Sequence, residues 1–315
     1  MLAPTSPASV ALLSLGASLR ARGYRFTTPT PLTHQRVNQR PDNQQAHTLT
    51  DVFGWSRPLS RAVLEDELFE LMRQAEVLEA HGEQWISRVR WSSLGDDLFV
   101  HSRFPTTEAD AVFFGPDTYR FARAIRAHLR QDTRPVTRIV DIGCGAGPGA
   151  LTAAQLRPEA EVLALDINPR ALAFTAVNAR LAGCFNLAAR HSDLLRNVDG
   201  VFDLIVANPP YMLDPQQRTY RHGGGTHGAG LSLQIFDAAL ERLAPGGTLL
   251  LYTGVAIFDG EDPFFDALQP SLADLGWVWD YEEIDPDVFG EELEKPAYAT
   301  ADRIACVVLR LTRPL

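Results

Sequence analysis

Three short apolar stretches in this sequence of 315 residues carry a polar side chain at their carboxyl ends: Asp141, Asp166 and Asn208. Each stretch has the length and composition of a buried strand. Because the carboxyl ends of parallel strands meet at one edge of a sheet, where open α/β sheets bind ligands, we expect these side chains to lie close together. Carboxylate and amide oxygens accept hydrogen bonds, so this edge could hold a ligand with hydroxyl or amino groups.

A glycine-rich turn follows the first of these stretches. From Arg138 to Gly149 the sequence reads Arg-Ile-Val-Asp-Ile-Gly-Cys-Gly-Ala-Gly-Pro-Gly, and good helix formers continue to Leu156. Glycine has no Cβ atom and tolerates positive φ angles, so a ligand can approach this backbone closely, beside the free N–H groups of a helix N-terminus. Taken alone, such a turn is also compatible with a tight structural connection.

Two later features favour the ligand site. Asp166 lies 23 residues after Gly143, close to the spacing of roughly 20 residues at which a carboxylate after the second strand meets ribose hydroxyls. The third stretch ends in Asn-Pro-Pro-Tyr at positions 208–211. The sequence therefore predicts a site for a nucleoside-containing ligand, with a side-chain amide beside it.

With these residues, the chain resembles the class I S-adenosylmethionine-dependent methyltransferases. Val-Asp-Ile-Gly-Cys-Gly-Ala-Gly, at 140–147, is similar to their first motif, and Asn-Pro-Pro-Tyr is similar to the fourth motif of the amino-methylating branch. That branch includes the glutamine-N5 methyltransferases of translation release factors (the PrmC/HemK family) and the adenine-N6 methyltransferases of RNA and DNA. The resemblance covers about residues 113–255.

The resemblance implies S-adenosyl-L-methionine as the cofactor. An acid after the third strand, Asp193, would accept from the adenine amino group, although a solvated turn is the alternative. Phe114 and Thr118 would line the pocket for the methionine end, or they belong to a turn with buried aromatics. The implied cofactor-binding residues are Asp141, Gly143, Cys144, Gly145, Gly147, Asp166, Ile167, Asp193, Leu194, Asn208, Phe114 and Thr118, with Cys144 as a small spacer.

The four residues of the Asn-Pro-Pro-Tyr motif, Asn208, Pro209, Pro210 and Tyr211, are the expected catalytic residues. Amide and adenine nitrogens are poor nucleophiles because their lone pairs are conjugated. The Asn208 side-chain oxygen and the Pro209 carbonyl would accept both N–H bonds and expose that lone pair. The prolines stiffen the loop, and Tyr211 offers a face on which a planar amide or base can stack.

The acceptor remains open between a protein glutamine and an adenine. The formal charge of −10 and the acidic span 259–287 are a poor match for a phosphate backbone, which favours a release-factor-like protein over RNA. If the partner is RNA, Arg88, Arg90, Arg218 and Arg221 are the expected phosphate contacts. A third reading is a cofactor-binding subunit without catalysis, but Asp166 and Asn208 are both intact.

The loop 213–230 after the motif contains several glycines and is interpreted as a lid or substrate clamp. Gly228 to Leu231 partly matches a Gly-Gly-x-x-Gly-Leu pattern of the glutamine branch. His227 stands where that branch has an acid, a departure that leaves the branch open. His222 and His227 are interpreted as polar loop residues, and no metal-ligand spacing is present.

From residue 138 onward, strands and helices alternate, which predicts a mostly parallel α/β sheet with seven strands in a Rossmann-like order. The expected strands are 138–142, 161–165, 187–191, 202–207, 247–252, 276–280 and 304–311. The expected helices are 120–130, 148–157, 169–182, 231–243 and 262–274. By resemblance only, the last strand would insert antiparallel between the fifth and sixth.

Residues 1–112 are expected to form a smaller α+β domain, either winged-helix-like or a plain cap on the methyltransferase domain 113–315. The expected elements are helices over 7–22 and 59–78, the latter closed by His81-Gly82, a loop over 27–45, and strands over 85–91 and 97–102. No stretch reads as a membrane span, and the three scattered cysteines fit a reducing cytoplasm.

Overall fold

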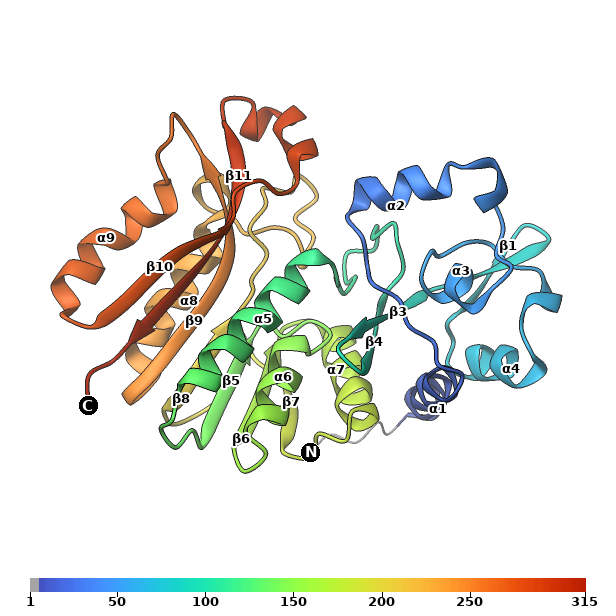
Figure 1. The fold of residues 1–315 in the computed structure, drawn as a ribbon, viewed down its shortest axis with the longest axis horizontal. Coiled ribbons are helices and arrows are strands. Elements are labelled where there is room, and N and C mark those ends of the chain that lie inside the picture. Colours follow the sequence, from blue (N-terminus) through green and yellow to red (C-terminus); the bar gives the residue numbers. More distant parts are fainter. Residues whose placement is uncertain (1–5) are drawn as a thin grey trace.

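A computed structural model describes residues 6–315. Its central feature is a seven-stranded sheet with the order β10-β11-β9-β8-β5-β6-β7 (Figure 1). The strands are β5 (Arg138–Ile142), β6 (Glu161–Asp166), β7 (Leu187–His191), β8 (Phe202–Ala207), β9 (Leu243–Ile257), β10 (Val278–Asp285) and β11 (Arg303–Thr312). β11 pairs antiparallel with both β9 and β10. The other five strands, β9, β8, β5, β6 and β7, run parallel to one another. This confirms the class I methyltransferase topology and the inserted last strand.

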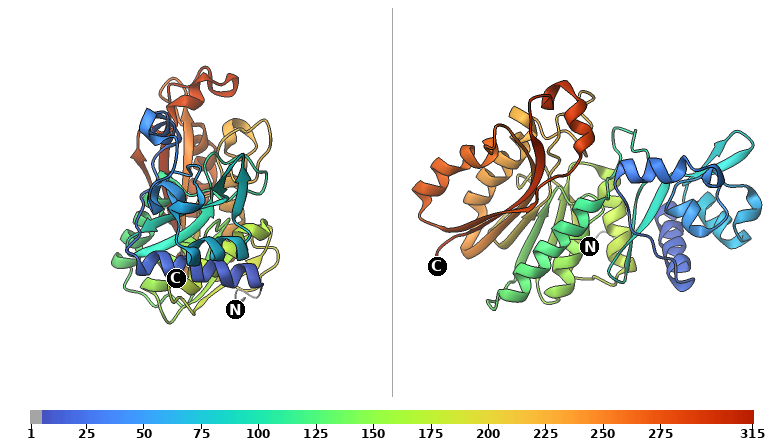
Figure 2. Two further views of the ribbon diagram at one scale, coloured as in Figure 1. Left: turned by 90° about the vertical axis from the view of Figure 1, so that its right-hand side faces the viewer. Right: turned by 45° about the horizontal axis from the view of Figure 1, so that its top comes forward.

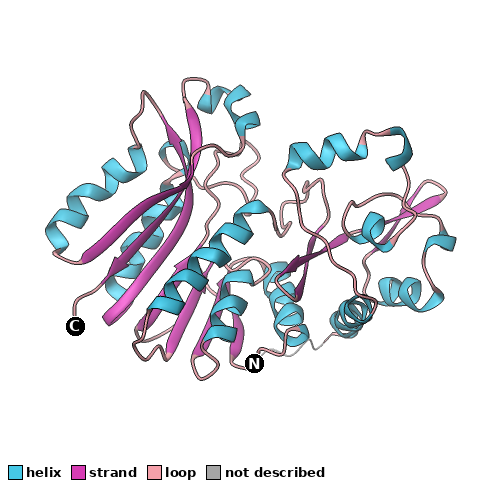
Figure 3. Ribbon diagram, in the orientation of Figure 1, coloured by secondary structure: helices cyan, strands magenta, loops and turns pink. Residues whose placement is uncertain are grey.

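Helices cover both faces of the sheet because its strands, apart from the polar edge strand β10, are apolar on both sides. One face packs under α5 (Pro116–Gln131), α6 (Pro148–Leu156) and α7 (Pro169–Leu181). The other face packs under α8 (Gly230–Arg242) and α9 (Pro263–Leu275). Neighbouring strand residues alternate between the two cores, so Ile139 belongs to the first and Val140 to the second. Figure 3 shows the resulting three layers.

The N-terminal part combines helices with two separate hairpins. Its helices are α1 (Pro7–Ala21), α2 (Pro31–Asn38), α3 (Leu49–Phe53) and α4 (Asp66–Gln74), and its strands are β1 (Leu78–His81), β2 (Gln84–Ser87), β3 (Val89–Leu94) and β4 (Asp97–Ser102). β1 pairs with β2, and β3 pairs with β4. The smaller α+β part expected from the sequence is therefore present.

This N-terminal part packs on α7, beyond the β7 edge of the sheet (Figures 1 and 2). The buried Asn178 side chain of α7 accepts from the Val100 N–H at 2.8 Å and donates to the Val100 carbonyl at 3.1 Å. Trp91 lies so close to Gly16 that a Cβ there would be 2.5 Å from its ring. One hydrophobic core runs through both parts, and a domain boundary at residue 112 stays a prediction.

Several expected elements of the N-terminal part were wrong. The helix expected over 59–78 is the shorter α4, which begins at Asp66 and ends at Gln74, just before Glu76 turns the chain with a φ of +60°. Gly82, with φ of +61°, closes the tight β1–β2 hairpin instead of capping a helix. The expected loop 27–45 contains α2, which begins at Pro31 with Thr30 as N-cap, and a 3₁₀ turn over Pro41–Asn43. The expected strand 85–91 is divided at Arg88 between β2 and β3.

In the sheet, two predicted strands differ from the structure by more than one residue at their ends. β9 is longer than the expected 247–252, because it pairs with β8 from Leu243 onward and with β11 as far as Ile257. β10 begins at Val278 and not at 276, because Gly276 has a φ of +62° and caps α9. Within residues 6–315, no helix is long and apolar enough to cross a membrane.

Candidate functional site

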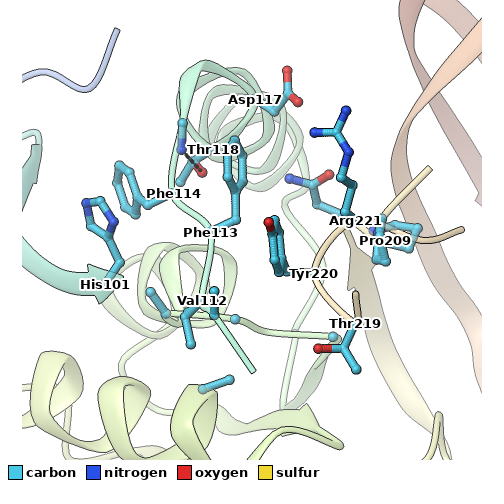
Figure 4. A pocket seen from close by; sticks show the side chains of 18 of the residues that line it. His101, Val112, Phe113, Phe114, Asp117, Thr118, Pro209, Thr219, Tyr220 and Arg221 are labelled. Atoms are coloured by element: carbon cyan, nitrogen blue, oxygen red, sulfur yellow. Dashed lines mark hydrogen bonds between the residues drawn. The ribbon is translucent and has the colours of Figure 1, made fainter. Parts of the chain in front are cut away.

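A cavity of about 390 Å³ opens at the carboxyl edge of the sheet, where β5, β6 and β8 end. Its volume lies in the range of small-molecule sites. Figure 4 shows part of its wall, with His101, Phe113 and Phe114 on one side and Pro209, Tyr220 and Arg221 on another. The expected site residues that line it are Phe114, Thr118, Asp141, Gly143, Cys144, Gly145, Asp166, Ile167, Asp193, Leu194, Asn208, Pro209, Pro210 and Tyr211. Gly147, also expected there, is not part of the lining.

The glycine turn forms the floor of the cavity. Gly143 and Gly145 have φ angles of +70° and +55°, a conformation that L side chains rarely adopt. Beneath the turn, the fully buried Asp141 accepts from the Ala150 N–H at 2.8 Å, near the start of α6. Its second oxygen, Oδ1, has no partner among the described residues. Burial raises the pKa of Asp141 to about 8.

Asp166 stands at the end of β6 with both carboxylate oxygens turned to backbone. Oδ2 accepts from the Gly145 N–H and Oδ1 accepts from the Asn168 N–H, each at 2.9 Å. Burial raises the pKa of Asp166, and the backbone N–H groups act in the opposite direction. Each oxygen keeps further lone-pair capacity. The next residue, Ile167, is apolar and yet 50% exposed, so it presents an apolar surface beside the carboxylate of Asp166.

Asp193 and Leu194 lie in the turn after β7. Asp193 forms an ion pair with Arg196 and is largely exposed, so the solvated-turn reading and the ligand reading both remain open for it. Leu194 has a φ of +49°, an uncommon conformation for a residue with a side chain. Backbone strain of this kind clusters at ligand sites.

In the motif after β8, the side-chain amide of Asn208 has no hydrogen bond to the described residues, whereas the ring of Tyr211 is held in place. The Asn208 side chain lines the cavity, and no hydrogen bond of it is found within residues 6–315. Tyr211 is only 7% exposed. Its ring lies so close to Gly254 that a Cβ there would be 2.1 Å from it. Little of the ring is therefore open for stacking, and that expected role stays a prediction.

Asp117 holds the Tyr211 ring in place through the tyrosine hydroxyl. Its buried carboxylate accepts from the Tyr211 hydroxyl at 2.5 Å and from the Tyr252 hydroxyl at 2.9 Å. Arg120 lies 3.2 Å away on the same helix. Burial raises the pKa of Asp117, and the hydrogen bonds from both tyrosines oppose that effect. The sequence places α5, β8 and β9 far apart, so this network was not foreseen.

The glycines of the loop 213–230 pack directly against the motif. A Cβ on Gly228 would lie 2.0 Å from the Tyr211 carbonyl oxygen, and its φ is +89°. A Cβ on Gly223 would lie 2.7 Å from the Pro210 oxygen. The Gly223 N–H donates to the Met212 carbonyl at 2.9 Å. These glycines are needed for close backbone approach, which holds the motif in place.

The same loop reaches across the cavity to the segment 104–110. The Tyr220 hydroxyl donates to the Thr106 carbonyl at 2.6 Å, and the Thr219 hydroxyl donates to the Ala109 carbonyl at 3.1 Å. The loop therefore has the position of a lid. His222 accepts from the Asp214 N–H at 3.2 Å, and His227 packs on Phe258. Among the described residues, no cluster of metal-ligating side chains is found.

Many residues that line the cavity were not among the expected site residues, and five of them bear on its chemistry. They are Arg90, His101, Phe113, Asp117 and Tyr220. Phe113 and Asp117 directly precede Phe114 and Thr118, which the sequence analysis named. Arg90 and His101 come from the β3–β4 hairpin, and only the packing of that hairpin on α7 brings them to the cavity.

Comparisons with known proteins agree with this fold. Residues 120–255 match the family model described as Methyltransferase small domain. A release factor glutamine methyltransferase from Deinococcus radiodurans is 32% identical over 198 residues, which are 59% of this chain and 66% of that protein. One from Cereibacter sphaeroides is 34% identical over 175 residues, which are 52% of this chain and 60% of that protein. The resemblance to these methyltransferases is thereby confirmed, and the match spans slightly less than two thirds of their length.

The solved structures found by comparison are more distant in sequence. A SAM-dependent methyltransferase from Agrobacterium tumefaciens superposes with a TM-score of 0.49 at 17% identity, over 75% of this chain and 72% of that chain. A methyltransferase from Pyrococcus furiosus gives a TM-score of 0.44 at 18% identity, over 65% and 89%.

Proposed function

We propose that this chain transfers a methyl group from S-adenosylmethionine to the side-chain amide nitrogen of a glutamine in a protein acceptor, with a translation release factor as the favoured acceptor. The observation that carries the proposal is the Asn208 side-chain amide, which has no hydrogen bond to the described residues and lines a cavity together with Asp166 and the glycine turn. The similarity to release factor glutamine methyltransferases supports the choice of acceptor.

The residues of the cavity fit the proposed cofactor. Asp166 keeps lone pairs for ribose hydroxyls, and the exposed Ile167 beside it suits the face of an adenine ring. A Cβ on Gly143 would meet no atom within 4 Å, so the turn leaves open space above its backbone. When bound, the cofactor's sulfonium supplies an electrophilic methyl group. The protein's task is to position the acceptor nitrogen.

Positioning falls to the Asn-Pro-Pro-Tyr motif. The Asn208 side-chain oxygen and the Pro209 carbonyl accept the two N–H bonds of the acceptor amide, which exposes its lone pair. The glycines of the loop 213–230 and the Asp117–Tyr211 hydrogen bond hold this motif rigidly. Orientation of this kind can contribute several of the roughly 7–11 kcal/mol available from positioning reactants.

Charge favours a protein over a nucleic acid as acceptor. Of the four arginines considered for phosphate contacts, Arg90 is buried. The other three form ion pairs with acids, which are Arg88–Glu108 at 3.3 Å, Arg218–Asp214 at 2.7 Å and Arg221–Glu292 at 2.5 Å. A phosphate backbone would have to break these pairs. Binding of the acceptor should therefore depend only weakly on salt.

A methyl-transfer assay tests the proposal. Purified protein is incubated with tritiated S-adenosylmethionine and either release factors or total RNA. We expect label in the protein fraction, and a loss on the order of 10²–10³ in rate for Asn208→Ala, because a pre-placed polar group at the reacting centre is lost. Asn186→Ala is the control, since that amide binds only backbone carbonyls far from the cavity.

Label in RNA would move the assignment to the adenine branch. In that case, the acceptor affinity should fall by roughly 0.7 log units per log unit of salt for each single-strand phosphate contacted. Wild-type turnover in Asn208→Ala would contradict amide methylation altogether. We further propose a cytoplasmic location, which rests on Cys144, Cys184 and Cys306 being free thiols in the structure.

A further inference from the structure

Among residues 6–315, Arg90 is a buried cation without a counterion. Arg90 is 4% exposed. Its Nε and Nη2 atoms are buried and have no hydrogen-bond partner in the part of the chain that the structure describes. No ion pair of Arg90 is found among residues 6–315 either. Burial lowers the pKa of the guanidinium to about 10, which still leaves it charged at neutral pH. Nothing in the proposed reaction uses this side chain.

The β3–β4 hairpin directs Arg90 into the cavity. Arg90 pairs directly with His101, so both side chains lie on the same face of the hairpin. The His101 ring stacks on Phe114, with ring centroids 5.0 Å apart and an angle of 18° between the planes. Arg90, His101 and Phe114 all line the cavity, and Figure 4 shows His101 beside Phe114.

The neighbours of Arg90 do not neutralise it. Both nitrogens of His101 are occupied, because Nε2 lies 2.7 Å from the Ser92 hydroxyl and Nδ1 lies 3.0 Å from the Ser102 carbonyl. Burial lowers the pKa of His101 well below its usual value, and the nearby positive charge of Arg90 lowers it further, so this ring is neutral. The Phe26 ring lies 5.3 Å from the guanidinium carbon and offers only a cation–π contact.

An unpaired buried charge is costly, because the protein interior repays little of the lost hydration. Such a cost is tolerated at functional sites when a ligand supplies the missing partner. The guanidinium is a planar fork that suits a carboxylate, and its Nε–Nη2 edge is sealed from the cavity by burial, so the N–H groups of Nη1, which is not fully buried and has no hydrogen-bond partner among the described residues, are the donors that a ligand oxygen in the cavity meets first. The ligand group that best satisfies this site is therefore a carboxylate.

We propose that Arg90 binds a carboxylate of a ligand in the cavity, so that the N-terminal part of the chain contributes directly to ligand binding. The proposal rests on the proposed function for the identity of the ligand. Two ligands could supply this carboxylate: the cofactor, through its amino-acid end, and the protein acceptor, through an acidic side chain. The position of Arg90 beyond Phe114, which is expected at the methionine end, favours the cofactor.

Calorimetry with two thioethers tests the proposal in the full chain. S-adenosylhomocysteine carries the carboxylate, and 5′-methylthioadenosine lacks it. Arg90→Met should weaken the binding of S-adenosylhomocysteine by at least about tenfold, because a hydrogen bond between two charged groups is lost. Binding of 5′-methylthioadenosine should change less than about twofold. Arg88→Met is the matched control, since Arg88 lies two residues away and pairs with Glu108 at the surface.

The other outcomes are distinct. A loss confined to binding of a release factor by the S-adenosylhomocysteine-loaded protein supports the acceptor as the source of the carboxylate. Equal weakening of both thioethers, with a lower melting temperature of the free protein, would assign Arg90 a structural role and overturn the proposal. Unchanged affinities for both thioethers and the release factor would also overturn it. Wild-type protein that binds neither thioether would refute the proposed function itself.

Discussion

Removal of the Asp117 carboxylate should destabilise the protein strongly. In Asp117→Ala, the hydroxyls of Tyr211 and Tyr252 both lose their acceptor inside the core. An orphaned buried polar group costs about 1–3 kcal/mol, so the two together predict a loss of about 2–6 kcal/mol in the free energy of unfolding. Asp117→Asn keeps one carbonyl acceptor and should lose less than half of that amount.

Urea denaturation followed by circular dichroism measures both variants. The matched control is Asp117→Ala combined with Tyr211→Phe and Tyr252→Phe, which removes the orphaned hydroxyls and should recover part of the lost stability. Asp117→Asn should also lower the turnover number while the cofactor affinity stays near wild type, because Tyr211 belongs to the motif that positions the acceptor. A loss below about 1 kcal/mol in Asp117→Ala would refute the view that this carboxylate fixes the ring.

The remaining predictions concern the cofactor, the lid and pH. Asp166→Ala should weaken S-adenosylmethionine by at least tenfold in calorimetry, since two hydrogen bonds to a charged acceptor are each worth about 1.5–3 kcal/mol; unchanged affinity in a folded variant would remove this assignment. Gly228→Ala should lower turnover with little effect on cofactor affinity, because a Cβ there meets the Tyr211 carbonyl at 2.0 Å; wild-type kinetics would show that the loop is not fixed against the motif. Burial raises the pKa of Asp141 to about 8, above its unfolded value of about 3.9. Folding therefore takes up a proton between these pH values, and the free energy of unfolding of wild type should fall from pH 4 to 8 relative to Asp141→Asn. Parallel pH profiles in urea denaturation would contradict this.

The sheet could be predicted from the sequence because its signals are local. The strands β5, β6 and β8 are short apolar runs that end at a glycine, an acid or an asparagine, and the helix after β6 begins at a clear cap, Asn168. The N-terminal errors came from signals with two readings. His81-Gly82 can close a helix or a hairpin, and Pro31 can break a helix or begin one. Only the surrounding packing decides between them.

The candidate site divides in the same way. The acids and glycines at strand ends could be named from the sequence, because topology alone brings the carboxyl ends of parallel strands together. The partners of Tyr211 could not be named, since Asp117 and Gly254 meet it only after three distant elements pack. Arg90 was expected to contact phosphate if the partner is RNA, but the β3–β4 hairpin buries it against the cavity, which leaves little of the side chain for such a contact. The sequence could not show this burial, because it depends on how the hairpin packs.

The position of the transferred methyl group tests the central claim most directly. A release factor incubated with the protein and S-adenosylmethionine is digested, and the modified peptide is sequenced by tandem mass spectrometry. The proposed function predicts one added methyl group on the side-chain nitrogen of a glutamine, which is absent when Asn208→Ala replaces the wild type. A methyl group on any other atom of the release factor, or an unmodified release factor beside methylated adenine in RNA, would contradict it.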